Sequence, residues 1–301
     1  MIRDAAKRLF EAIANASPLD LTLRATLAML LFSRWVLGDD WLYFTPLLML
    51  AGVGLVVPGF YKSRVLWYGI AACMVLKTID HWWVQDNHLF LLTLLCLAIA
   101  IALAFESSKE VLAQNGRLLL GISFFFAVVW KCFLSPDYMS GAYFHYSILT
   151  DNRFSEEAAI LANLSPETVN ENVREVFEVV TQRKSVGTLK TSQAARRAGQ
   201  VITWHTAIIE ALLALTFLWP RPGLVRRSRN LVFLAFAWTT YLAAPVITFG
   251  WTLSILCIAQ TENEERRGRF LLVMTLPLLF AYKHVPAMEA LASWVVSQLW
   301  N

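Results

Sequence analysis

The sequence of residues 88–105, HLFLLTLLCLAIAIALAF, contains no acidic residue, lysine or arginine. A helix of roughly 20 apolar residues crosses the hydrocarbon core of a bilayer, so this run predicts a transmembrane helix. Pro245 and Gly250 leave open whether residues 230–260 form two short spans or one kinked helix. The predicted fold is all-α, a polytopic transmembrane helical bundle of eight or nine spans. The expected spans lie at about 20–38, 42–60, 65–82, 88–105, 118–134, 201–219, 230–245, 247–260 and 269–284.

The composition of the chain agrees with this fold class. Hydrophobic residues make up 57% of the 301 residues and charged residues 16%, and the mean hydropathy is +0.52, a balance that no soluble core of this size requires. Helices are expected rather than strands, because a backbone in lipid must satisfy its own hydrogen bonds. Lysine and arginine are spread over short loops, so we expect a lipid bilayer as partner and no nucleic acid.

The short basic loops set the predicted orientation. Lysine and arginine precede the first expected span and follow the second, fourth and sixth. Loops of this kind remain in the cytoplasm. The sequence therefore predicts a multi-pass protein of the cell membrane, with a cytoplasmic N-terminus and with residues 135–200 outside the cytoplasm.

The predicted membrane domain comprises residues 19–285. Two further segments flank this domain, and a third is inserted into it. Residues 1–18 are charged and amphipathic, which predicts an interfacial helix rather than a cleaved signal peptide. Residues 135–200 predict a helical cap, in which Ser165 caps a helix that begins at Pro166 and continues with valines at helical spacing. Residues 286–301 predict a second amphipathic helix.

Ionisable residues inside or beside a membrane span are costly and are therefore functional candidates. Arg34 is expected to meet an acidic partner such as Asp80 or Glu210. The predicted topology also places four histidines at the outer face together with Lys131, although interfacial side chains could simply form a polar belt there. The spacing of the histidines does not predict a metal site. These four histidines are His81, His88, His145 and His205.

Lys131 is the sharpest candidate among these residues. It follows a long apolar run that ends at Trp130. An apolar environment disfavours the charged ammonium, and a neutral lysine can act as a base. The alternative is a lysine at a helix end whose ammonium reaches the membrane surface.

Three segments share their pattern with one known membrane family. Residues 86–91, DNHLFL, are similar to Asn-Asn-His-x-Tyr-Leu at the start of a span. Residues 127–131 followed by 137–141 are similar to Gly-x-x-Lys-Leu-x-x-Asp-Trp-x-x-Gly, and residues 244–256 are similar to a late span of the same family. In this order the segments resemble the HTTM (horizontally transferred transmembrane) domain, the membrane portion of vitamin K-dependent gamma-glutamyl carboxylase and its bacterial relatives.

The resemblance implies an enzyme that uses a reduced quinone similar to vitamin K hydroquinone and acts on a peptide or protein substrate. Lys131 would remove a proton from the hydroquinone, and His88 and Asn87 would lie in the same membrane pocket. We therefore assign Lys131 and His88 to catalysis, no residue to a metal, and five residues to cofactor binding: Asn87, His81, Trp130, Tyr138 and His205.

The sequence leaves open whether the chain is an enzyme at all. The main alternative is a non-catalytic accessory, maturation or immunity factor that retains the fold without the chemistry. A small-solute transporter is a weaker alternative, because no inverted repeat is visible.

Overall fold

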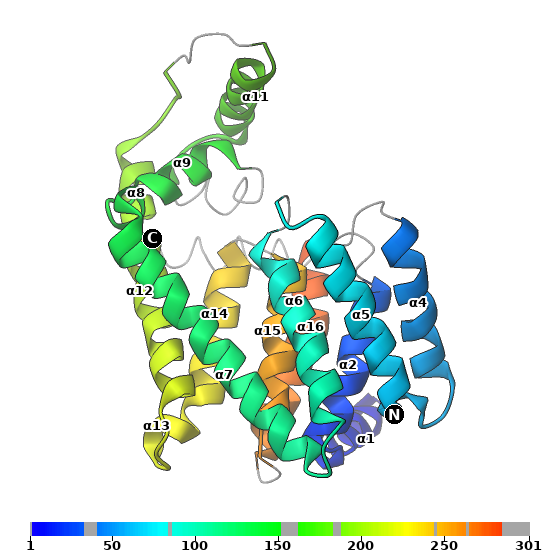
Figure 1. Cartoon of the computed structure of the whole chain (residues 1–301). Coiled ribbons are helices and arrows are strands. Elements are labelled where there is room, and N and C mark those ends of the chain that lie inside the picture. The colour runs from blue at the N-terminus through cyan, green and yellow to red at the C-terminus, as the bar shows by residue number, and fades with distance from the viewer. Residues whose placement is uncertain are drawn as a thin grey trace. The chain divides into compact units, whose positions relative to one another are not determined.

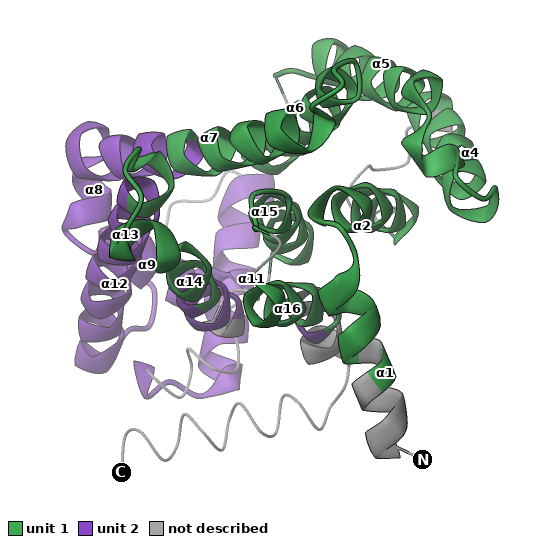
Figure 2. Ribbon diagram, turned by 90° about the horizontal axis from the view of Figure 1, so that it is seen from below, with its two compact units in different colours: residues 1–122, 216–234, 246–277 green, residues 123–215, 235–245, 278–301 purple. Residues whose placement is uncertain are grey.

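The computed structural model describes residues 2–32, 41–83, 86–151, 162–182, 188–243, 246–262 and 265–284. Within these ranges every regular element is a helix and no strand occurs, so the all-α prediction is confirmed (Figure 1). The chain divides into two compact units, coloured separately in Figure 2. The first unit comprises residues 1–122, 216–234 and 246–277, and the second unit comprises residues 123–215, 235–245 and 278–301.

Five helices of the first unit follow one another in a closed cycle of contacts: α2 (Pro18–Phe32), α4 (Trp41–Val56), α5 (Arg64–Asp80), α6 (Asn87–Ala102) and α15 (Ile247–Ala259) (Figure 2). The last of these contacts both α6 and α2. From Thr252 to Ala259, every residue of α15 is buried. This apolar helix therefore forms the centre of the first unit's core.

Three further elements belong wholly to the first unit: α1 (Ile2–Asn15), η1 (Phe60–Lys62) and α13 (Leu224–Arg227). Gly59 begins the turn before η1 with a φ of +77°, a conformation that favours glycine. The buried Arg269 guanidinium donates to the Ala16 carbonyl at 2.7 Å and thereby ties down the end of α1.

Four helices contain the boundary between the units: α7 (Ser108–Val129), α12 (Gln193–Leu218), α14 (Arg229–Ala243) and α16 (Arg266–His284). Arg229, at the start of α14, is buried and donates to the carbonyls of Thr216 and Trp219 at 2.7 and 2.9 Å. These carbonyls lie at and just beyond the end of α12, where a helix leaves its acceptors without partners. Arg229 therefore caps α12.

The second unit contains the predicted cap: η2 (Trp130–Leu134), α8 (Pro136–Met139), α9 (Ala142–Thr150) and α11 (Pro166–Gln182). The predicted helix start is confirmed, because Ser165 Oγ accepts from the Thr168 backbone N–H at 3.2 Å. The valine stripe is buried at Val169 only, and its far end is exposed at Val180. A small core of Ile148, Leu149, Ala162, Ala195 and Ala198 joins α9 to α12.

The described helices do not confirm the eight or nine spans that we expected. Two stretches are long and apolar enough to cross a membrane, α7 continued by η2 (108–134) and α12. The apolar helices within α4, α6 and α15 have 10–17 residues, shorter than a span requires. The turn at Pro58 and Gly59 explains why α4 ends before residue 60. Two separate helices, α14 and α15, occupy residues 230–260, and the predicted helix at 286–301 lies outside the described residues.

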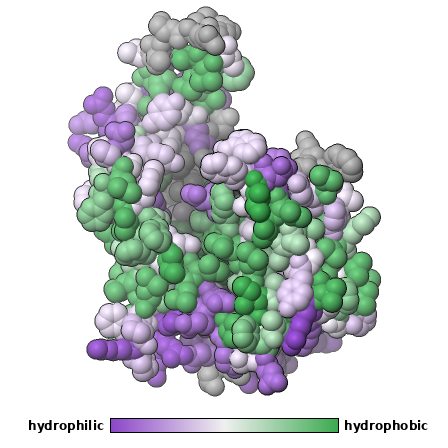
Figure 3. Space-filling view, in the orientation of Figure 1, coloured by the Kyte–Doolittle hydropathy of each residue, from purple (hydrophilic) through white to green (hydrophobic). Residues whose placement is uncertain are grey.

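Large apolar side chains nevertheless cover much of the surface of the helices. In the first unit, α5 exposes Val65, Leu76 and Ile79, and α6 exposes Leu94 and Ile101 (Figure 3).

Candidate functional site

A buried ion pair between Lys131 and Glu210 is the centre of the candidate site. The Lys131 ammonium, in η2, donates to Glu210 Oε1, in α12, and both residues belong to the second unit. Their side chains are 16% and 10% exposed. Buried charges are kept in proteins only where they are paired, so each side chain depends on the other.

The local sequence explains why the helix changes at Lys131. Pro136 has no backbone N–H to continue an α-helix, and it disfavours helical geometry at the preceding residue. Ser135 accordingly has φ −125° and ψ 88°, and the five residues before it form a π-helix. Single π-turns inside α-helices occur frequently at functional sites. The wider turn here carries the lysine that faces Glu210.

The aromatic ring of Tyr138 packs against the Lys131 ammonium. Lys131 Nζ lies 5.0 Å from the centre of the Tyr138 ring, a cation–π contact. The Tyr138 hydroxyl lies 2.7 Å from Thr206 Oγ1, which itself donates to the Ile202 carbonyl at 2.9 Å. The tyrosine is therefore the donor, and its hydroxyl is already engaged. Tyr138 is 2% exposed, so it positions the ammonium rather than offering a free hydroxyl to a ligand.

Two buried side-chain oxygen atoms of the second unit lack hydrogen-bond partners among the described residues. They are Glu210 Oε2 and the Tyr241 hydroxyl. Tyr241, in α14, is 2% exposed, and its ring packs edge-on against Phe236 with ring centres 5.9 Å apart. Buried polar atoms are usually satisfied, so each of these two atoms is a candidate for a partner that the described residues do not supply.

The remaining predicted residues of the second unit lie at other contacts. Trp130 is half-exposed and packs edge-on to Tyr138 with ring centres 6.5 Å apart. His205 is exposed, and its Nε2 lies 2.9 Å from Thr239 Oγ1. His145 Nε2 lies 2.7 Å from Thr191 Oγ1. Lys131, His205 and His145 therefore each contact a different polar side chain, Glu210, Thr239 and Thr191 respectively.

Three predicted residues belong to the first unit. His81 follows the end of α5, and Asn87 and His88 are the first two residues of α6. Asp86 caps this helix by accepting from the backbone N–H groups of His88 and Leu89. The same aspartate lies 3.2 Å from His88 Nδ1, and the His88 ring lies 4.5 Å from that of Phe249. His81 Nδ1 lies 3.5 Å from Asp80, which also accepts from Tyr43. Asn87 is exposed.

The sequence prediction named Glu210 as an ionisable candidate and as an acidic partner for Arg34. Glu210 pairs with Lys131 instead, and Arg34 lies outside the described residues. Thr206 and Tyr241 were not predicted to take part. One signal was available in the sequence, because Thr206 and Glu210 are four residues apart and so share a face of a helix.

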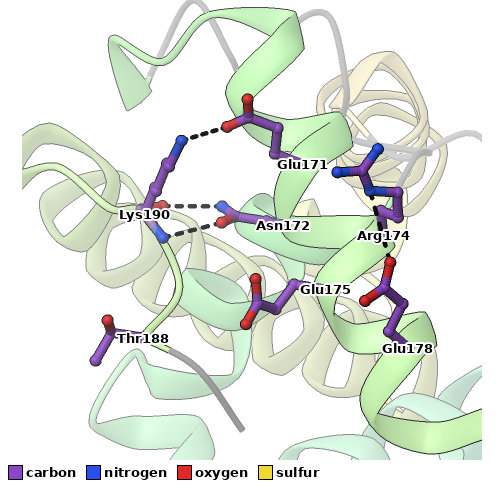
Figure 4. A pocket seen from close by; sticks show the side chains of 7 residues that line it. All are labelled: Glu171, Asn172, Arg174, Glu175, Glu178, Thr188 and Lys190. Carbon is purple, nitrogen blue, oxygen red and sulfur yellow. Dashed lines mark hydrogen bonds and ion pairs between the residues drawn. The ribbon is translucent and has the colours of Figure 1, made fainter. Parts of the chain in front are cut away.

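A second polar cluster lies in the cap, between α11 and residues 188–190 (Figure 4). The Asn172 amide exchanges two 2.9 Å hydrogen bonds with the backbone of Lys190. The Lys190 ammonium pairs with Glu171, and Arg174 pairs with Glu178. These contacts hold residues 188–190 against α11. The polar cluster is therefore explained by its structural role.

Among the described residues, no group of three or more His, Cys, Asp or Glu side chains is placed to hold a metal ion. In comparisons with known proteins, no family model, no curated protein and no solved structure matches the chain.

Proposed function

We propose that the chain is a multi-pass protein of the cell membrane with residues 135–200 outside the cytoplasm. Two helices that are long and apolar enough to cross a bilayer support this proposal. Exposed apolar side chains on the shorter helices support it as well, because lipid would cover them.

The proposed activity is that of an HTTM-type membrane enzyme that binds a reduced quinone and acts on a peptide or protein. The observation that carries the proposal is the buried Lys131–Glu210 pair at the end of a membrane-length helix. An ionisable pair carried by two helices of membrane-spanning length is costly and is therefore a functional candidate by default.

The residues of the second unit suit a hydroquinone in two respects. Glu210 Oε2 is a buried acceptor that has no donor among the described residues. Trp130, which is half-exposed and packs against Tyr138, adds aromatic surface. A reduced quinone, when bound, would supply the electrons for chemistry with oxygen.

The pair itself accounts for the base. Transfer of the shared proton from Lys131 to Glu210 Oε1 would replace two buried charges by a neutral amine and a neutral acid. Neutralisation avoids the cost of holding two ions in an apolar site. The Lys131 amine would then be able to take a proton from a ligand hydroxyl.

The test is to give purified protein a reduced naphthoquinone and oxygen and to assay the quinone epoxide. We expect wild type and Lys190→Arg, a control at the exposed pair, to form the epoxide. Lys131→Arg should form none, because arginine retains the ion pair but stays protonated. Equal activity in Lys131→Arg would exclude Lys131 as the base. No epoxide from wild type would favour the non-catalytic accessory role.

A further inference from the structure

We propose that an arginine-rich surface of the first unit binds the phosphate headgroups of anionic phospholipids in the cytoplasmic leaflet. The surface is formed by α13, by the start of α14 and by the start of α16, all of which belong to the first unit. The proposal rests on the proposed function only for the side of the membrane on which this surface lies.

The positive charge of the chain is concentrated in the two segments that form this surface. Residues 221–229 contain four arginines and no acidic residue, and residues 262–269 contain three arginines and three glutamates. Together they carry a net charge of +4, the same as that of the whole chain. Neither segment contains a lysine. Either basic residue would set the orientation in a membrane, whereas only the guanidinium group matches a phosphate through two parallel hydrogen bonds.

Three contacts bring the two segments together. Arg226, in α13, forms an ion pair with Glu262. Asn230, the second residue of α14, donates to Glu265 Oε2 at 3.0 Å. A Cβ at Gly268, in the first turn of α16, would lie 3.1 Å from Asn230 Nδ2. The start of α16 therefore packs against the start of α14, and the arginines of both segments lie on one surface.

The arginines of this surface divide into an internal and an external set. Arg226 is paired with Glu262, Arg229 caps α12, and the buried Arg269 donates to the Ala16 carbonyl. These three side chains hold the helix ends in place. The other four arginines are exposed, and no described residue forms a hydrogen bond or an ion pair with them: Arg221, Arg227, Arg266 and Arg267.

Exposed apolar side chains beside these arginines point to a lipid rather than to a free anion. Leu224, in α13, is 83% exposed, and Trp219, just beyond the end of α12, is 37% exposed. Gly223 precedes Leu224 with a φ of +140°, a conformation that favours glycine. A phospholipid presents a phosphate next to hydrocarbon chains, so it would contact both the guanidinium groups and the leucine. A soluble anion would leave the leucine in water.

The test measures how lipids stabilise the full chain in an uncharged detergent. Dioctanoyl phosphatidylglycerol, dioctanoyl phosphatidylcholine and inorganic phosphate are added separately at matched ionic strength, and the unfolding temperature is followed against concentration. A ligand that binds the folded chain raises this temperature. We expect phosphatidylglycerol to bind about tenfold more tightly than phosphatidylcholine. Inorganic phosphate should have no effect.

Arg266→Gln/Arg267→Gln should weaken the binding of phosphatidylglycerol by about tenfold. Arg196→Gln/Arg197→Gln is the matched control, because it also removes two adjacent exposed arginines near the start of a long helix, α12, but in the second unit. This control should bind phosphatidylglycerol as wild type does.

Three results would overturn the inference. They are an equal response of wild type to the two lipids, unchanged binding in a folded Arg266→Gln/Arg267→Gln, and a response to inorganic phosphate as strong as that to phosphatidylglycerol. Each of them leaves the proposed activity in place, because the assay contains no quinone. Failure of the epoxide assay would in turn leave the lipid site in place.

Discussion

At the residue scale, two lysine–glutamate pairs among the described residues of the second unit differ in burial. Lys131 and Glu210 are 16% and 10% exposed, whereas Lys190 and Glu171 are 64% and 52% exposed. Removing one partner from a buried pair leaves an uncompensated charge, which costs about 3–5 kcal/mol. Exposed pairs contribute only about 0–1 kcal/mol because water screens them.

Lys131→Met should therefore lower the thermal unfolding temperature in detergent far more than Lys190→Met does. The double variant Lys131→Met/Glu210→Leu should recover most of the loss, because neither charge remains buried. A double variant that unfolds at the same temperature as Lys131→Met alone would contradict the pairing.

His145 should make the stability of the cap depend on pH. Burial, and then the charge of Arg196, lower the pKa of His145 below its ordinary value of 6.5. Between the lowered value and 6.5 the unfolded chain binds more protons than the folded chain, so the free energy of unfolding rises with pH across that window. We expect the unfolding temperature to fall as the pH is lowered through 6.5, and to fall less in His145→Gln. Identical pH profiles for both proteins would rule this out.

At the scale of the elements, α9 packs on α12 through glycine. A Cβ at Gly199 would lie 2.7 Å from the His145 backbone nitrogen and 3.0 Å from the Gly141 carbonyl oxygen. Backbone atoms cannot move aside as a flexible side chain can. Gly141 also has a φ of +81°, so the turn between α8 and α9 depends on glycine twice. This contact fixes the short helix that carries Tyr138.

Gly199→Ala should therefore destabilise the second unit, by about 1–3 kcal/mol as in other overpacked sites. Gly52→Ala is the matched control, because a Cβ at Gly52, in α4, meets no atom within 4 Å. Alanine is the better helix former, so that variant should be neutral or more stable by up to about 1 kcal/mol. Thermal unfolding of the two variants in the same detergent gives the comparison.

The elements also show how far the sequence could predict the fold. The helix caps at Ser165 and Asp86 are formed between residues that are close in the sequence, so a local pattern can predict them. The cap at Ser165 was predicted correctly. The sixth span was predicted at about 201–219, and the helix that contains most of it, α12, begins earlier, at Gln193, because its first turns are polar and escape a search for apolar runs. The Lys131–Glu210 pair joins residues 79 apart, and such a contact depends on tertiary packing that no local pattern contains. The π-turn at 130–134 could not be predicted either, because no periodic spacing of apolar residues marks it in the sequence.

At the scale of the whole molecule, the membrane proposal makes a prediction about sidedness. If residues 108–134 and α12 both cross the bilayer, the loop before α7 and the loop after α12 lie on one side, and the cap between them lies on the other. The basic residues of the two loops place them in the cytoplasm. Ser107, Ser165 and Leu224 are exposed positions in these three segments.

Single cysteines at these three positions test the prediction in intact cells. The background carries Cys73→Ala and Cys132→Ala and keeps Cys96 and Cys257, which are buried and should not react. We expect a membrane-impermeant maleimide to label Ser165→Cys in intact cells, and to label Ser107→Cys and Leu224→Cys only after the membrane is made permeable. Labelling of all three in intact cells, or of none, would show that these two helices do not cross the bilayer, and the buried Lys131–Glu210 pair would then have to be explained in the core of a soluble fold.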